Sequence, residues 1–263
     1  WNLPFINNKD KWIMIWNTIK LSLKRSKLDL VSPDKLAAVD DASIADWATE
    51  KMSENIYQFL IRPGVEPFWY FSCNDVSRAM TTVLQARAAD AKFYTFQHGM
   101  ARISEKLLEK SDLKLNATVT DIKLNGKVEI GYTISNESKQ ITADYLVMAT
   151  PATTTAKLLK AQLNNPIGHF ISSQKYVHNV HATYLVDEEL TKGMYAYYYP
   201  CGDWETPIGA IVFHKLKCYN SVKAPEGKEL ISIYLLDQPS KELMDSGIDN
   251  NQMMEKIWKL GKD

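Results

Sequence analysis

The sequence predicts an α+β protein in which a helical lobe is combined with a mixed or antiparallel β-sheet. Apolar residues recur at helical spacing through the first hundred residues, and runs rich in β-forming residues begin near Leu113. The composition is globular, with 45% hydrophobic and 24% charged residues, and 31 basic side chains balance 31 acidic ones. This balance argues against general nucleic-acid binding, and seven Trp, thirteen Tyr and eight Phe supply ample apolar area for a core.

The first predicted helix carries one apolar stripe, formed by Trp12, Ile15, Trp16, Ile19 and Leu23. Lysines and an arginine surround this stripe. We favour packing of the stripe against the helix's own domain. The alternative is a peripheral contact with an anionic membrane surface through residues 11 to 27.

Further helices are expected in the first lobe. Helix-start signals predict a second helix from Ser43 to Met52. The tripeptide Arg62-Pro63-Gly64 is expected to break the helical pattern, because proline lacks an N–H donor. An aromatic run, Phe68 to Phe71, then precedes a helix from Val76 to Ala86.

A β-rich segment follows the helical spacing of Met100, Ile103 and Leu107. The dipeptide Asn125-Gly126 predicts a type I′ hairpin turn, in which both central residues have positive φ. The run from Tyr145 to Ala149 is apolar on both faces and predicts a buried central strand. Strands are also expected at Val180–Val186, Tyr195–Tyr199, Ile208–His214 and Leu230–Leu236, with a final helix from Asn251 to Leu260.

Several classes of site are excluded by their missing motifs. The sequence contains no glycine-rich phosphate loop and no zinc-protease or serine-hydrolase motif. Cys73, Cys201 and Cys218 lie far apart, so we expect no metal cluster and no disulfide framework. A reducing, cytoplasmic location is the expectation, with no apolar run long enough to span a bilayer.

A longer ordered pattern resembles a known family. It comprises Phe96-Gln97-His98-Gly99-Met100, a helix, a strand around Val119, the Asn125-Gly126 hairpin and the run from Ala143 to Ala152. The pattern resembles the middle of the flavin-dependent amine oxidase superfamily, which includes protoporphyrinogen oxidases, monoamine oxidases and carotenoid desaturases. The flavin-binding GxGxxG loop and the closing flavin segment of that family are not found here, so we expect an internal portion of a longer enzyme.

The resemblance divides the chain into three parts. Residues 1–112 resemble the mainly helical part of the substrate domain, and residues 113–160 resemble the β-meander and strand of the FAD-binding domain. Residues 161–263 resemble the β-rich remainder of the substrate domain, with a C-terminal helix.

The resemblance also implies the residues that contact FAD. The backbone of Val119 matches the position beside the adenine side of the cofactor, although a plain buried strand valine fits equally well. Ala149, Thr150, Pro151 and Ala152 match the loop that passes near the flavin, where small residues permit close approach.

The sequence also offers a few candidates for catalytic and substrate-binding residues. His181 aligns loosely with a strand position that carries a flavin-facing lysine in several amine oxidases, and the alternative is a half-buried structural histidine. Trp69, Tyr197 and Tyr199 could line an apolar substrate cavity, or belong to the core. Arg78 and Arg87 could bind a carboxylate, or lie on a solvated helix face.

We therefore expect the substrate-binding portion of an FAD-dependent oxidoreductase that oxidises an amine or a conjugated hydrophobic substrate. The cofactor chemistry resides in the complete protein, and this chain alone is expected to be inactive. The alternative is a non-enzymatic module that binds a ligand or a protein partner and lacks a cofactor domain.

Overall fold

The computed structural model describes residues 5–24, 33–88, 92, 94, 96, 99–159, 163–190, 196–198, 207–217 and 224–262. The chain divides into two compact units. Unit 1 comprises Trp1–Gly99 and Val177–Asp263, and unit 2 comprises Met100–Tyr176. Helices and two antiparallel sheets confirm the predicted α+β class.

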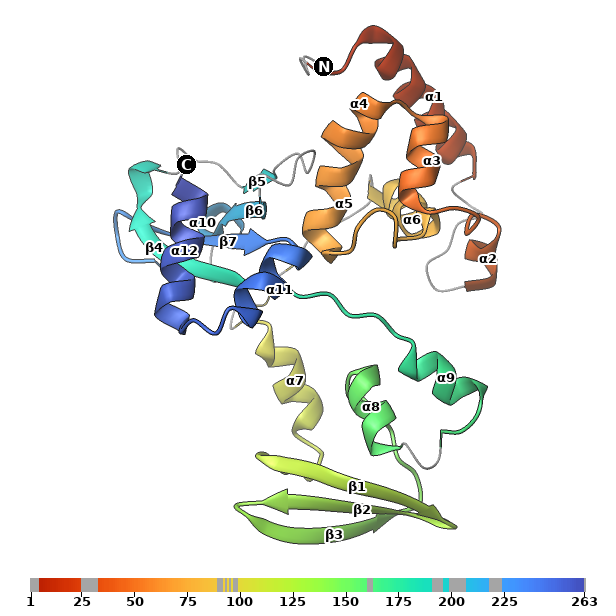
Figure 1. Cartoon of the computed structure of the whole chain (residues 1–263), viewed down its shortest axis with the longest axis vertical. Helices are drawn as coiled ribbons and strands as arrows, with labels where there is room; N and C mark the ends of the chain where they lie inside the picture. The colour runs from red at the N-terminus through yellow and green to blue at the C-terminus, as the bar shows by residue number, and fades with distance from the viewer. Residues whose placement is uncertain are drawn as a thin grey trace. The chain divides into compact units, whose positions relative to one another are not determined.

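The first part of unit 1 is helical (Figure 1). Its elements are α1 (Asn8–Lys24), α2 (Pro33–Ala37), α3 (Ile44–Lys51), α4 (Glu54–Ile56), η2 (Tyr57–Ile61), α5 (Arg62–Trp69) and α6 (Arg78–Ala88). The side chain of Ser43 caps α3 by accepting the N–H of Asp46 at 3.0 Å, as the helix-start signal predicted. The core of this lobe includes Ile44, Ile56, Val65 and Cys73.

The apolar stripe of α1 does not pack against its own domain, so the favoured prediction is wrong. Trp12 is 71% exposed, Trp16 58% and Leu23 78%. The opposite face of the helix packs instead, with Ile13 and Met14 against the core. The sequence pattern identified one apolar face, but α1 has two.

The expected break at Arg62-Pro63-Gly64 is also wrong, because α5 begins at Arg62 and follows directly on η2. The segment Tyr57–Ile61 is a π-helix, in which the backbone is wound more widely than in an α-helix. Pro63 occupies the first turn of α5, where its missing N–H is tolerated. The widened turn therefore lets the proline continue the helix.

The second part of unit 1 is a four-stranded antiparallel sheet of order β4-β7-β6-β5. Its elements are β4 (His181–Asp187), η3 (Glu188–Leu190), β5 (Ala196–Tyr198), β6 (Ile208–Phe213), α10 (His214–Lys217), β7 (Lys228–Leu235), α11 (Asp237–Asp245) and α12 (Asn250–Lys262). Helices α11 and α12 lie against this sheet (Figure 1). Leu243 and Ile257 of these helices enter a core with Ile233 and Leu235 of β7, and all four expected strands and the last helix are confirmed.

Unit 2 contains a three-stranded antiparallel meander. Its elements are α7 (Ala101–Leu108), β1 (Ala117–Asn125), β2 (Lys127–Ile134), β3 (Glu137–Ala143), α8 (Ala152–Leu158) and α9 (Pro166–Ser172). The hairpin lies at Asn125-Gly126 as expected, but of these two residues only Gly126 has a positive φ, of 80°. The pair with positive φ at both central positions is Ser135-Asn136, between β2 and β3.

A β-bulge explains why the first turn is not type I′. Ala117 pairs with Ile134 and Val119 with Tyr132, but Asp121 pairs with Gly131. The extra residue between Val119 and Asp121 shifts the register by one, so that Asn125 pairs with Lys127 and Gly126 alone forms the tip.

The predicted buried strand from Tyr145 to Ala149 is wrong in this structure. The segment forms no strand, and Tyr145 is 90% exposed and Val147 88%. A buried central strand needs a hydrogen-bonded neighbour on each side, and in the described residues neither sheet includes Tyr145–Ala149.

Candidate functional site

The residue predicted to meet the adenine side of FAD lies on an edge strand. The sheet order is β1-β2-β3, so β1 has a neighbour on one side only. Val119 of β1 is 39% exposed and immediately precedes the β-bulge. Val119 is therefore not a buried strand residue, and backbone groups on the outer edge of β1 are available to a ligand or another strand.

The loop predicted to pass near the flavin lies at the start of α8. Ala149, Thr150 and Pro151 are exposed, and Pro151 is the N-cap of the helix. The backbone N–H of Ala152 donates to the Tyr176 hydroxyl at 2.6 Å. The hydroxyls of Thr150 and Thr155 lie 2.8 Å apart, so side chains of unit 2 hold the turn in place.

These features fit one side of a dinucleotide cofactor. An edge strand with a bulge and a loop of small exposed residues allow close approach of a flat ligand. Val119 could meet it through its backbone, and Ala149 to Ala152 could contact it through the loop. The diphosphate needs a cradle of backbone N–H groups, and the sequence has no glycine-rich loop of that kind. The chain thus fits part of the cofactor, and its cradle would come from elsewhere.

His181 lies in unit 1, on the edge strand β4, and is exposed. Its ring stacks on Tyr234 of β7, with centroids 4.9 Å apart and an interplanar angle of 19°. The two residues are direct cross-strand partners, so stacking orients the imidazole. An exposed, oriented imidazole could hold a water or relay a proton, and its catalytic role stays a prediction.

A hydrogen-bonded chain lies on the same face of this sheet. The Ser232 hydroxyl is 2.6 Å from the Thr183 hydroxyl and 2.7 Å from His214 Nε2. Ser232 is only 1% exposed, so a substrate has no access to its hydroxyl. We therefore assign this cluster a structural role in the sheet.

The helical lobe contains a cavity of about 660 Å³, a volume in the range of small-molecule sites. Its walls come mainly from α1, α3, α4, η2, α5 and α6. The lining is mainly apolar, and the charged residues among it are Lys20, Lys24, Lys51 and Arg78. None of the lining residues in the part of the chain that the structure describes is acidic.

The structure places one of the three predicted substrate residues in this cavity. Trp69 lies in the wall, at the end of α5. The side chain of Tyr197 and the whole of Tyr199 lie outside the described residues. Arg78 also lines the cavity, but its Nη2 donates to Asp41 at 2.8 Å and its Nε to the Val39 carbonyl at 3.1 Å. The side chain of Arg87 lies outside the described residues.

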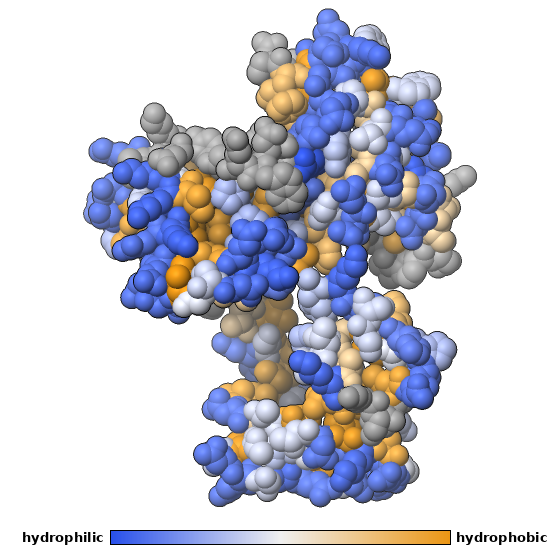
Figure 2. All heavy atoms as spheres, in the orientation of Figure 1, coloured by the Kyte–Doolittle hydropathy of each residue, from blue (hydrophilic) through white to orange (hydrophobic). Residues whose placement is uncertain are grey.

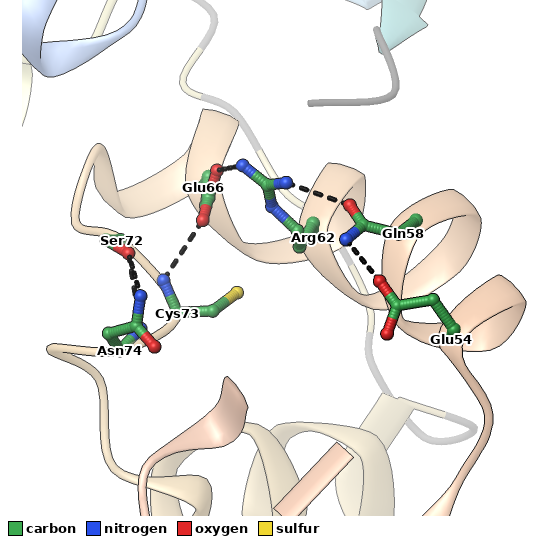
Figure 3. Close-up of polar contacts among 7 residues, drawn as sticks. All are labelled: Glu54, Gln58, Arg62, Glu66, Ser72, Cys73 and Asn74. Atoms are coloured by element: carbon green, nitrogen blue, oxygen red, sulfur yellow. Dashed lines mark hydrogen bonds and ion pairs between the residues drawn. The ribbon is translucent and has the colours of Figure 1, made fainter. Parts of the chain in front are cut away.

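A polar ladder along α4, η2 and α5 was missed by the sequence interpretation (Figure 3). The Gln58 amide donates to Glu54 at 2.6 Å, and its oxygen accepts from Arg62 at 2.8 Å. Arg62 Nη2 pairs with Glu66 at 3.3 Å. The spacing of four residues was the available signal, because residues at i and i+4 are neighbours on a helix.

One member of the ladder, Arg62, lies beside a buried tyrosine. The guanidinium of Arg62 lies 5.9 Å from the ring centroid of Tyr57. Burial, with a smaller contribution from Cys73, raises the pKa of Tyr57 to about 12. Tyr57 is therefore a protonated structural residue at neutral pH and no candidate for proton transfer.

Comparisons with known proteins identify the family. The sequence model of the family of flavin containing amine oxidoreductases matches residues 26–260 of this chain. Among curated proteins, no sequence matches this chain. Many solved structures have a similar fold, and three of them illustrate the similarity. An oxidoreductase from Methanosarcina mazei has a TM-score of 0.66 at 13% identity, over 97% of this chain and 57% of that one.

The other two structures are amine oxidases by name. Cyclohexylamine oxidase from Brevibacterium oxydans gives a TM-score of 0.63 at 13% identity, over 98% of this chain and 56% of that one. A triple mutant of putrescine oxidase gives a TM-score of 0.62 at 15% identity, over 94% of this chain and 56% of that one. This chain thus spans little more than half the length of these structures. The extent of the family match shows that the chain belongs to the flavin containing amine oxidoreductase family.

Proposed function

We propose that this chain is the substrate-binding portion of an FAD-dependent oxidoreductase that oxidises a hydrophobic substrate. FAD, when bound, supplies the hydride acceptor, and this chain supplies a mainly apolar cavity and part of the cofactor's surroundings. Membership of a flavin containing family supports the reaction class. The proposal includes the division of the chain that the family resemblance implies, into residues 1–112, 113–160 and 161–263.

The observation that carries the proposal is the exposed apolar surface of unit 2. Tyr145 and Val147 are almost fully exposed, although their sequence is that of a strand covered on both faces. Val119, Ala149 and Pro151, which the resemblance assigns to the cofactor, are exposed in the same unit. Orange, hydrophobic residues are visible on the surface of this unit in Figure 2. A surface of this kind fits a cofactor domain that supplies further strands and the diphosphate loop.

The cavity of the helical lobe favours a conjugated hydrophobic substrate over an amine. An ammonium group that enters a largely apolar cavity loses its hydration and needs a carboxylate to compensate. No acidic residue lies among the described cavity walls, and Lys20, Lys24 and Lys51 would repel a cation. Trp69 offers a flat apolar surface to a conjugated ring or polyene. We place the reaction in the cytoplasm, because scattered cysteines suit a reducing compartment.

The absorbance spectrum of the purified full-length protein tests the proposal. We expect visible flavin bands, and bleaching of these bands when a hydrophobic substrate is added without oxygen. A full-length protein that takes up no flavin after reconstitution would instead support the alternative of a non-enzymatic binding module. Bleaching by simple amines alone would contradict the substrate class and leave the flavin assignment intact.

A further inference from the structure

Helix α1 carries apolar residues on two opposite faces. With about 100° between successive residues, Met14, Asn17 and Leu21 lie on one side of the helix. This inner face is anchored to the lobe: Met14 packs on the core, Leu21 packs against Val83 and Ala86, and Asn17 Nδ2 donates to the Met52 sulfur at 3.4 Å. Ile13, beside this inner face, also packs on the core, so the packing of α1 comes from Ile13, Met14, Asn17 and Leu21.

The outer face presents large apolar side chains to solvent. Trp12, Trp16, Ile19 and Leu23 fall within roughly 60° of one another on the helix, and Ile15 flanks them. All five are exposed, from 40% for Ile15 to 78% for Leu23. Single exposed apolar residues are ordinary, but a continuous stripe of five over three turns marks an interaction surface.

The charges of α1 are those of a helix that meets an anionic surface. The helix contains four lysines, Lys9, Lys11, Lys20 and Lys24, and one acidic residue, Asp10. Asp10 is only 2% exposed, so α1 itself presents no exposed carboxylate beside the stripe. Lys20 Nζ lies 5.2 Å from the Trp16 ring centroid, and Trp16, Lys20 and Lys24 also contribute to the lining of the cavity in the helical lobe.

We propose that the outer face of α1 docks on an anionic lipid membrane, with the helix axis in the plane of the interface. Tryptophans favour the boundary between headgroups and acyl chains, and flanking lysines reach anionic headgroups. A protein partner would need carboxylates placed to match each lysine, whereas anionic lipids supply diffuse negative charge to all of them. Within the described residues, no helix is long and apolar enough to cross the membrane, and surface docking does not need one. The inference is independent of the proposed flavin chemistry.

Vesicle flotation of the full protein tests the inference. We expect binding to vesicles of phosphatidylcholine mixed with phosphatidylglycerol, little binding to phosphatidylcholine alone, and weaker binding at raised salt because salt screens the lysines. The double variant Trp12→Ser/Leu23→Ser should lower partitioning roughly tenfold or more, which equals about 1.4 kcal/mol. Both residues are exposed, so folding should be retained.

A matched control uses exposed apolar residues elsewhere. Ile167 and Phe170 of α9 are 65% and 67% exposed, so Ile167→Ser/Phe170→Ser makes an equivalent change away from the stripe. This control should bind vesicles like the unmodified protein. Equal binding by the stripe variant and the unmodified protein would overturn the inference.

A second pair of variants tests the charges. Lys20→Glu/Lys24→Glu should abolish binding to the anionic vesicles, while Lys256→Glu/Lys259→Glu, which changes the net charge equally on α12, should leave it unchanged. Failure of the unmodified protein to bind anionic vesicles contradicts the proposal. The proposal is also contradicted if the protein binds no lipid but self-associates, and Trp12→Ser/Leu23→Ser abolishes this self-association. The stripe would then be an interface with a second copy of the chain.

Discussion

The carboxylate of Glu66 accepts a hydrogen bond from the backbone N–H of Cys73, with Oε1 and N 3.1 Å apart. Glu66 is 7% exposed and Cys73 is fully buried, so the bond fixes the chain after α5 to the helix. The second carboxylate oxygen pairs with Arg62. One side chain therefore ties together the helix, the turn that follows it and the polar ladder.

Glu66→Ala should lower the free energy of unfolding by about 3 kcal/mol, because it leaves a buried N–H without its acceptor and breaks a largely buried ion pair. Glu66→Gln should cost less, since the amide oxygen can still accept from Cys73. Urea denaturation measures both. The control is Glu109→Ala, which removes an exposed i,i+3 pair with Lys106 and should change stability by no more than about 0.5 kcal/mol. Equal losses for Glu66→Ala and Glu109→Ala would contradict this view of the ladder.

Asp10 makes the anchoring of α1 sensitive to acid. Its N–H donates to Asn7 Oδ1 at 2.9 Å, and its carboxylate accepts the N–H of Asn7 at 3.1 Å. Hydrogen bonding to the Ser53 hydroxyl, which outweighs the opposing effect of burial, lowers the pKa of Asp10 below its ordinary 3.8. A lowered folded-state pKa stabilises the protein above pH 3.8, and that contribution is lost as the pH falls through the folded-state value.

The expected result is a pH-dependent difference between the unmodified protein and Asp10→Asn. Thermal unfolding should show the variant destabilised at neutral pH, with the difference shrinking below pH 3.8. Asn7→Ala, which removes the acceptor of the Asp10 N–H and leaves the carboxylate ionisable, should retain the acid sensitivity. A gap between the unmodified protein and Asp10→Asn that is constant with pH would be inconsistent with the assignment.

Gly209 provides the close approach of β6 to α5. A Cβ at this position would lie 3.3 Å from Pro67 Cβ and 3.1 Å from Leu236 Cδ2. Gly209→Val should therefore destabilise unit 1 by about 2 kcal/mol through overpacking, and Gly209→Ala by less. Gly64→Ala is the control, since its Cβ meets nothing within 4 Å and alanine is the better helix former, so it should stabilise by roughly 0.5–1 kcal/mol. Melting temperatures that rise for both alanine variants would show that the contact is loose.

Local sequence signals predicted most elements, because capping residues, alternation and helical spacing act over a few neighbours. The type of the first hairpin turn was not predictable, since a bulge five or six residues away changes the register that reaches Gly126. The packed face of α1 was missed because Met14, Asn17 and Leu21 form a less hydrophobic stripe than the exposed one. Tertiary neighbours, and not periodicity, decide which face is buried.

The candidate site was likewise predictable only in part. Contacts of Val119 and Ala149–Ala152 with FAD were inferred from a family resemblance. The structure adds that Val119 lies on an edge strand and that Ala149–Pro151 lie in an exposed loop. The cavity could not be derived from the sequence, because its lining residues extend from Ile13 in α1 to Gln85 in α6. Trp69 was named as a substrate residue from its aromatic surroundings, and the structure places it in the cavity wall at the end of α5.

The exposed segment Tyr145–Ala149 gives the most direct test of the proposed cofactor domain. If this segment is covered on both faces in the full-length protein, Val147→Lys would bury a charge without a partner and prevent the segment from docking. The flavin-to-protein absorbance ratio of the purified full-length variant should then fall severalfold. Phe170→Lys, also at an exposed apolar residue of unit 2, is the control and should keep its flavin. Full flavin content in Val147→Lys would mean that the segment stays exposed beside the cofactor domain, and its two-faced apolar pattern would need another partner.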